Sequence, residues 1–449
     1  MTFLFEKKHF SSFRIIIFGF MLVIFAGALL LTLPIATTDG HGALFTDALF
    51  TSTSAVCVTG LVLHDTATYW APFGQFIIML LIQIGGMGVV TVAVAIAVVS
   101  GRKIGLMQRS TMQEAIAAPQ VGGIVRLTEF ILKMTITIEC LGAAVMAPVF
   151  CREFGFLKGI WYAVFHSVSA FCNAGFDLMG VRAAFSSLTT YAGQPVINLA
   201  IMFLIVFGGI GFLTWEDITV HGLHFKKYRM QSKVILSVTG VLILIPAVYF
   251  YFCEFSKGAW ADFSVPEKVL ASMFQSVTPR TAGFNTVELT ALTEAGQMMM
   301  IILMLIGGSP GSTAGGMKTT TAAVLFASAI AVFRQKEEAH FFGRRVPEDT
   351  IKNAATILLM YLVLFLTGGI VISSIEGLPI LTCLFETASA IGTVGLSLGI
   401  TPGLSLISRL ILILLMFFGR VGGLTLVFAA LPGVHKNVSR FPKEKITVG

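Results

Sequence analysis

The stretch at residues 50–60, FTSTSAVCVTG, decides the fold because it interrupts an apolar region and then recurs along the chain. Its pattern is Phe, any residue, Ser or Thr, and a closing glycine about ten residues after the Phe. The pattern returns as FHSVSAFCNAG at 165–175, FQSVTPRTAG at 274–283, which is one residue shorter, and FETASAIGTVG at 385–395. The closing glycines lie 115, 108 and 112 residues apart. This periodicity indicates four copies of one structural unit.

A second glycine motif follows each of these stretches inside the next apolar run. It reads IGGMG at 84–88, FGGIG at 207–211, IGGSPG at 306–311 and FGRVGG at 418–423. The two motifs are offset by 25, 33, 24 and 24 residues. We therefore divide the chain into unit 1 (1–125), unit 2 (126–232), unit 3 (233–350) and unit 4 with a C-terminal cytoplasmic tail (351–449).

The composition is that of a polytopic membrane protein. Hydrophobic residues make up 56% of the 449 positions and charged residues only 12%, whereas a soluble protein carries about 25% charged residues. Uncharged runs such as 15–38, 71–101 and 353–375 exceed the roughly 20 residues that cross a bilayer as a helix. The first run is too long for a signal peptide and is interpreted as the first span. The six cysteines show no spacing typical of a metal site or a disulfide framework.

Each unit is predicted to contain an outer helix, a half-helix, a glycine break and an inner helix. The fold class is therefore an all-α membrane protein with eight spans and four re-entrant half-helices around a pseudo-fourfold pore. We expect outer helices at 13–33, 127–151, 233–253 and 353–374, half-helices at 43–54, 160–171, 267–277 and 380–390, and inner helices at 73–100, 194–222, 297–332 and 404–431.

The distribution of basic residues predicts the orientation in the membrane. Of the 30 Lys and Arg, 20 lie in the connectors between units, their flanks and the two tails, and about six lie on the opposite side. The positive-inside rule places both termini in the cytoplasm and opens all four glycine breaks to the outside. The net charge of +7 is explained by this topology, and nucleic-acid binding is a poor explanation of it.

The glycine breaks are typical of a cation site. Irregular backbone survives at membrane depth only inside protein or beside water, and carbonyl groups released from a helix can replace the hydration shell of a cation. The half-helices direct their partially negative C-terminal ends at the same place. The alternative, glycines that pack helices closely, is disfavoured because these glycines end their helices. The predicted filter for a potassium ion comprises Val58, Thr59, Gly60, Asn173, Ala174, Gly175, Thr281, Ala282, Gly283, Thr393, Val394 and Gly395.

This arrangement resembles the Trk/Ktr/HKT potassium-transporter superfamily across essentially the whole chain. All four loops keep glycine, and the chain is most similar to the KtrB-type membrane subunits of bacterial Ktr systems. The resemblance implies potassium uptake across the bacterial cytoplasmic membrane by a homodimer in the lipid bilayer. It also implies no enzymatic activity and no cofactor in this chain, because nucleotide binds a cytosolic octameric ring of KtrA-type subunits. Stimulation by sodium is left open.

The segment at 306–321, IGGSPGSTAGGMKTTT, is too rich in glycine for a continuous helix. A phosphate-binding loop is rejected because Met317 separates Gly316 from Lys318 and no strand precedes the segment. The resemblance implies an intramembrane gating loop formed by Gly307, Gly308, Ser309, Pro310, Gly311, Ser312, Thr313, Ala314, Gly315 and Gly316. Lys318 fits either a gate or a cytoplasmic vestibule.

Arg420 replaces a glycine in the fourth inner motif, and an intramembrane charge is generally functional. The resemblance implies that Arg420 faces the gating loop and forms a barrier in the pore. A lipid-facing arginine is the alternative.

Asp177 and Asn285 are expected at the outer mouth, and Arg280, His166 and Glu386 are expected to brace the pore loops. For Glu139 we expect an ion pair with Lys133.

Two other classes of protein remain as rivals. A sodium- or proton-coupled secondary transporter also has broken helices, but its halves are normally inverted. An intramembrane enzyme needs facing ionisable or nucleophilic pairs, and His64 and Asp65 lack a third partner.

Overall fold

The computed structural model describes residues 12–100, 104–116, 122–422 and 444. Within these residues the chain is helical, apart from one two-stranded hairpin, β1 (His340–Phe341) and β2 (Arg344–Arg345). The outer helices are α1 (Ser12–Leu31), α6 (Ile124–Phe154), α10 (Met230–Tyr249), which continues as a π-helical turn over Phe250–Glu254, and α14 (Glu348–Glu376). The half-helices are α2 (Phe45–Val56), α7 (Phe156–Phe171), α11 (Val265–Val277) and α15 (Ile380–Gly392).

The inner segments are less regular than the outer helices. They comprise α3 (Pro72–Met87) with α4 (Val89–Val99), α8 (Pro195–Gly209) with α9 (Phe212–His221), α12 (Glu294–Leu305) with α13 (Thr319–Phe333), and α16 (Leu406–Val421). Helix α5 (Leu106–Ile116) joins the first two units. Short 3-10 turns lie at Pro34–Ala36, Met179–Val181, Thr189–Tyr191, Phe225–Lys227, Gly258–Trp260, Leu289–Ala291 and Thr401–Gly403.

The prediction of continuous inner helices at 73–100 and 194–222 is wrong. The chain bends by 94° between α3 and α4 and by 99° between α8 and α9. The cause is the last glycine of each motif, because Gly88 and Gly211 have φ values of 86° and 93°, which an α-helix cannot contain. Gly422, with φ 89°, ends α16 in the same way. The rest of the predicted helix 404–431 lies outside the described residues.

A repeated hydroxyl group attaches the half-helices to the outer helices. Ser52, the third residue of the first quoted stretch, donates a hydrogen bond to Ile24 O on α1 at 2.7 Å. The equivalent hydroxyls in units 2 and 4 make the same contact. Ser167 donates to Glu139 O on α6 at 2.7 Å, and Thr387 donates to Phe365 O on α14 at 3.3 Å. The recurring Ser or Thr therefore fixes the half-helix against the outer helix in units 1, 2 and 4, whereas Ser276 of unit 3 donates to Met273 O within α11.

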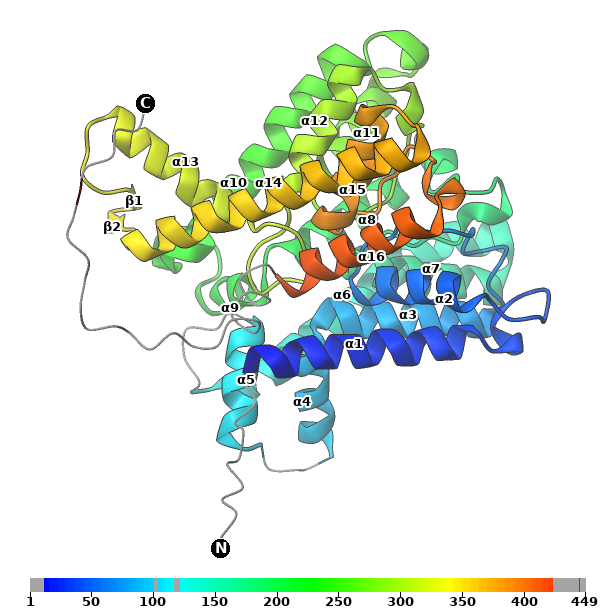
Figure 1. The fold of residues 1–449 in the computed structure, drawn as a ribbon, viewed down its shortest axis with the longest axis horizontal. Coiled ribbons are helices and arrows are strands. Elements are labelled where there is room, and N and C mark those ends of the chain that lie inside the picture. Colours follow the sequence, from blue (N-terminus) through cyan, green and yellow to red (C-terminus); the bar gives the residue numbers. More distant parts are fainter. Residues whose placement is uncertain (1–11, 101–103, 117–121, 423–443, 445–449) are drawn as a thin grey trace, which may run out of the picture.

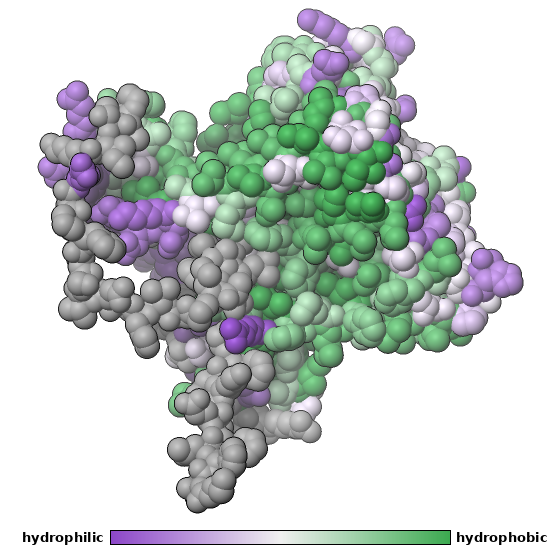
Figure 2. Space-filling model, in the orientation of Figure 1, coloured by the Kyte–Doolittle hydropathy of each residue, from purple (hydrophilic) through white to green (hydrophobic). Residues whose placement is uncertain are grey.

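The surface is that of a membrane-embedded protein. Among the described residues, the four outer helices are long and apolar enough to cross a membrane, and the two bent pairs bring the number to six by length and composition. Figure 2 shows hydrophobic side chains over the middle of this face and hydrophilic ones toward its two sides. In Figure 1, α4 and α5 turn away from the long helices, and α9, α13 and the hairpin lie toward the left of the view.

Candidate functional site

The four predicted filter segments share one backbone conformation. The first residue of each has a positive φ: 51° at Val58, 59° at Asn173, 68° at Thr281 and 51° at Thr393. The closing glycines have φ values of 93°, 69°, 78° and 94°, whereas the residue between is not in this region. Positive φ is costly for β-branched residues, so the surrounding structure must impose it. Such alternation turns carbonyl groups away from the helical direction in all four units.

The closing glycines contact one another in a closed order. A Cβ built on Gly60 would lie 2.4 Å from Ala174 O in unit 2, and one built on Gly395 would lie 2.1 Å from Thr59 O in unit 1. A Cβ built on Gly175 would lie 2.8 Å from Gly283 Cα in unit 3, and one built on Gly283 would lie 2.5 Å from Val394 O in unit 4. Each segment therefore touches the next, the fourth touches the first, and no side chain fits at these positions.

Hydroxyl groups of the half-helices hold the filter backbone. Ser54 Oγ accepts a hydrogen bond from the Gly60 N–H at 3.0 Å, and Ser389 Oγ accepts one from the Gly395 N–H at 3.0 Å. In units 2 and 3 a hydroxyl instead donates to the carbonyl that follows the glycine, from Ser169 to Phe176 O and from Thr278 to Phe284 O. We did not predict these residues, although serine six residues before the closing glycine in units 1, 2 and 4 was a usable signal.

In units 1, 2 and 4 the second glycine motif packs against the end of the half-helix. A Cβ on Gly85 would lie 2.0 Å from Val56 O, and one on Gly208 would lie 2.0 Å from Phe171 O. In unit 4, a Cβ on Gly419 would lie 2.1 Å from Ile391 O. The constant pairing of the two motifs follows from this contact, because only glycine lets the inner helix approach the half-helix so closely.

The intramembrane loop at 306–318 lies against these same inner motifs. Its backbone N–H groups donate to carbonyls of α8 and α16: Ser309 to Gly209 O at 2.9 Å, Thr313 to Gly208 O at 3.2 Å and Gly316 to Gly419 O at 3.1 Å. Irregular backbone at membrane depth needs such internal partners. The loop is thus part of the packed interior.

Arg420 joins the loop to the first unit. Its guanidinium group donates hydrogen bonds to Thr313 O on the loop, to Gly85 O and, at 3.0 Å, to Gly86 O on α3. Lys318 Nζ donates to Ala314 O at 2.9 Å and to Gly315 O at 3.3 Å. Both cations line a cavity of about 380 Å³ that also includes Glu114 of α5, so positive charge borders the space beside the loop.

A second cavity, of about 400 Å³, lies on the other side of the filter. All four closing glycines line it, together with Asp65, Asp177, Asn285 and Thr401. The structure therefore places Asp177 and Asn285 at a mouth that opens onto the filter. Burial, with a smaller contribution from the neighbouring Asp65 carboxylate, raises the pKa of Asp177 to about 7.

The bracing residues lie behind the pore loops. Arg280 Nη2 donates to Thr239 Oγ1 on α10 at 3.2 Å. The Leu178 N–H donates to His166 Nε2 at 3.3 Å, and Glu386 accepts hydrogen bonds from the Ser397 and Thr401 hydroxyls.

The predicted pair of Glu139 with Lys133 is wrong. Lys133 instead forms an ion pair with Glu129 at 2.7 Å, because residues four apart share one face of a helix and residues six apart do not. Glu139 faces the first unit, where it accepts a hydrogen bond from Gln83 Nε2 at 3.2 Å.

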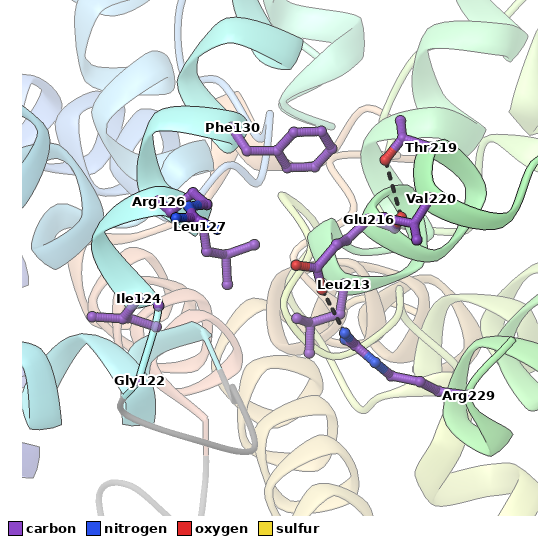
Figure 3. Close-up of a pocket in the computed structure, with 11 residues that line it drawn as sticks. Gly122, Ile124, Arg126, Leu127, Phe130, Leu213, Glu216, Thr219, Val220 and Arg229 are labelled. Atoms are coloured by element: carbon purple, nitrogen blue, oxygen red, sulfur yellow. Dashed lines mark hydrogen bonds and ion pairs between the residues drawn. The ribbon is translucent and has the colours of Figure 1, made fainter.

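Another cavity, of about 530 Å³, lies away from this pathway (Figure 3). Leu127 and Phe130 of α6 border it on one side, and Leu213 of α9 borders it on the other. Glu216 and Arg229 form an ion pair at 2.6 Å at its edge. None of its lining residues belongs to the filter or to the intramembrane loop.

Comparison with known proteins agrees with this geometry. The chain matches the TrkH family, described as "Cation transport protein", over residues 7–434. It is 39% identical to the potassium/sodium uptake protein NtpJ of Enterococcus hirae, over 99% of this chain and 98% of that protein. It is 38% identical to the Ktr system potassium uptake protein B of Bacillus subtilis, over 98% and 97%.

The fold is also similar to a solved structure. The potassium transporter TrkH from Vibrio parahaemolyticus superimposes with a TM-score of 0.74 at 20% identity, covering 96% of this chain and 87% of that one. The resemblance to the Trk/Ktr/HKT superfamily is confirmed, and with it the assignment to transporters and not to enzymes. The chain belongs to the TrkH family of cation transport proteins.

Proposed function

We propose that this chain is the membrane subunit of a potassium-uptake system and conducts K⁺ through its filter segments. The observation that carries the proposal is the closed order of contacts among the four closing glycines, each in a conformation that turns carbonyls out of the helix. K⁺ enters at the mouth beside Asp177, loses water to the filter carbonyls, and passes the intramembrane loop. The uptake proteins NtpJ and Ktr B support the choice of ion through their similarity to this chain.

Selectivity arises from carbonyl dipoles that replace the hydration shell of the ion. The half-helices α2, α7, α11 and α15 end immediately before the filter segments. The partial negative charge at their C-termini therefore adds to the attraction for a cation. The closed contacts between units limit how far the filter can contract around a smaller ion such as Na⁺.

The loop at 306–318 and Arg420 form the gate. Support comes from the hydrogen bonds that hold the loop against α8 and α16 and from the bonds of Arg420 to Thr313, Gly85 and Gly86. A fixed guanidinium group beside the path repels a permeating cation. Opening then requires the loop and Arg420 to leave these carbonyls together.

The proposed assembly is a homodimer in the bacterial cytoplasmic membrane, with eight spans and both termini in the cytoplasm, and the word system in the name of the Ktr relative supports further subunits. A cytosolic octameric ring of KtrA-type nucleotide-binding subunits regulates it, and this chain binds no cofactor of its own.

Rescue of a bacterium that lacks potassium uptake tests the proposed function. The wild-type chain should restore growth at low K⁺, and Gly60→Ser should abolish the preference for K⁺ over Na⁺. An unchanged preference would refute the filter assignment in the first unit.

Flux measurements in liposomes test the coupled transporter as the alternative, because obligatory movement of H⁺ or Na⁺ with each K⁺ would refute the channel-like pathway.

A further inference from the structure

Thr313 lies where the intramembrane loop reaches the filter. Its hydroxyl donates a hydrogen bond to Phe171 O, at the end of α7, at 2.9 Å and shares this hydrogen with Asn173 Oδ1 at 3.4 Å. All three residues are fully buried. In the described part of the chain, the matching carbonyls of Val56 and Ile391 accept no side-chain hydrogen bond. The loop therefore contacts the filter segment of unit 2 through the Thr313 side chain.

The surroundings determine the orientation of the Asn173 amide. Its Nδ2 lies 3.3 Å from Arg280 O and 3.3 Å from Thr281 Oγ1. Because a backbone carbonyl can only accept, the NH₂ group must face unit 3, which leaves Oδ1 directed at Thr313. Asn173 and Thr281 are the first filter residues of units 2 and 3. One side chain thus joins two filter segments to each other and to the loop.

We propose that Asn173 is a specificity-determining residue and that Thr313 positions it, so that selectivity for K⁺ over Na⁺ depends on the position of the loop. This inference rests on the proposed roles of the filter and of the loop. With the loop in place, the amide fixes the separation of units 2 and 3 at the inner end of the filter. When the loop leaves, Asn173 Oδ1 loses its donor and the amide is no longer held in this orientation.

The consequence is a filter whose inner end has two states. In the closed state Phe171 O is occupied by the Thr313 hydroxyl and the amide bridges two units. In the open state the bridge is no longer held from the loop side. A wider, less constrained ring of oxygens adapts to Na⁺ more readily, because discrimination depends on the number and rigidity of the coordinating carbonyls.

The test compares Thr313→Val with Thr313→Ser in the full-length protein reconstituted in liposomes. Valine has nearly the shape of threonine but no hydroxyl, and serine keeps the hydroxyl. Thr313→Val should lower the K⁺/Na⁺ permeability ratio by about fivefold, which corresponds to one hydrogen bond of about 1 kcal/mol. Thr313→Ser should retain the wild-type ratio. Thr356→Val is the matched control, since it removes an exposed threonine hydroxyl on α14 that donates to Lys352 O at 2.9 Å, away from the filter and the loop.

A double-mutant cycle with Asn173→Gly completes the experiment. Glycine tolerates the positive φ of position 173, so only the amide is lost. The ratio should fall in Asn173→Gly, and adding Thr313→Val should change it little further, because the two residues act as one unit. A wild-type ratio in Thr313→Val, or full additivity, would overturn the proposal. If basal K⁺ flux instead stays unchanged in both Thr313→Val and Arg420→Gln, the gate assignment itself fails.

Discussion

Gly60 is a residue that no other type can replace without moving a neighbouring unit. Its φ of 93° lies in the region that favours glycine. A Cβ there would approach Ala174 O to 2.4 Å, so even alanine displaces the carbonyl of the adjacent filter segment. Two neighbouring residues also fix the backbone here. The Thr59 carbonyl lies against Gly395, and the Ser54 hydroxyl accepts a hydrogen bond from the Gly60 N–H. The backbone conformation of Gly60 and its close contact with Ala174 therefore both exclude a side chain at this position of the proposed filter.

Arg420 provides a prediction for the gate. Arg420→Gln should raise basal Rb⁺ uptake into liposomes by about tenfold or more, because hydrogen bonds to a charged group contribute about 1.5–3 kcal/mol each. The guanidinium group holds Thr313 O and the α3 carbonyls together. The control Arg334→Gln removes an exposed arginine at the end of α13 and should leave uptake unchanged. Equal uptake by wild type and Arg420→Gln would speak against Arg420 as a barrier.

Asp177 predicts a dependence on external pH. Burial raises its pKa to about 7, so the side chain is charged above about pH 7 and neutral below it. Since it borders the mouth together with Asp65, protonation removes negative charge where the cation enters. Uptake at subsaturating K⁺ should therefore fall as external pH decreases from about 8 to about 6. Asp177→Asn should flatten this profile, and identical profiles for the two proteins would exclude Asp177 as the titrating group.

At the level of elements, the bends in the inner segments place α4 and α9 at nearly right angles to α3 and α8. The bend at Gly211 lies against the loop, because a Cβ there would approach Pro310 O to 2.6 Å. The bend at Gly88 has no such neighbour, since the nearest atom is Thr91 Oγ1 at 3.7 Å. Two similar backbone breaks thus have different surroundings, because only the one at Gly211 is in close contact with the loop.

These two glycines form a matched pair of variants. Gly88→Ala and Gly211→Ala should both lower the Tm in detergent, because a positive φ outside the left-handed helical well costs about 1–3 kcal/mol for alanine. Only Gly211→Ala should also raise basal K⁺ flux, since its Cβ displaces Pro310 and with it the loop. If both variants raised flux equally, the bend itself and not the contact with the loop would control the path.

The elements were predictable from sequence to different degrees. The half-helices and their breaks were predictable because the Phe-to-glycine pattern repeats four times, and α15 begins at the predicted residue, Ile380. The bends at Gly88 and Gly211 were not, because glycine is common inside apolar helices and only φ distinguishes a bend from a packing glycine. The Thr313–Asn173 contact was also out of reach, since it joins residues 140 apart. The pair of Glu139 with Gln83 depends on how α6 is rotated against α3, which local spacing does not encode.

At the level of the whole molecule, four units that are each incomplete form one site. No unit could bury its glycine break alone, because the unpaired carbonyls need neighbours or an ion at membrane depth. The contacts run from Gly60 to unit 2, through units 3 and 4, and back from Gly395 to unit 1. The inner motifs of units 2 and 4 hold the loop from unit 3, and Arg420 adds unit 1. The proposed filter and the proposed gate are therefore each built from several of the four units.

The K⁺/Na⁺ permeability ratio of purified protein in liposomes, measured for glycine-to-serine changes at positions 60, 175, 283 and 395, tests the single shared cation site most directly. Gly40→Ser is the control, since Gly40 also has a positive φ, 70°, but a Cβ there would meet no atom within 4 Å. Each of the four filter variants should lose most of its preference for K⁺, whereas Gly40→Ser should keep the wild-type ratio. A wild-type ratio in any one of the four would contradict a filter built from all four units.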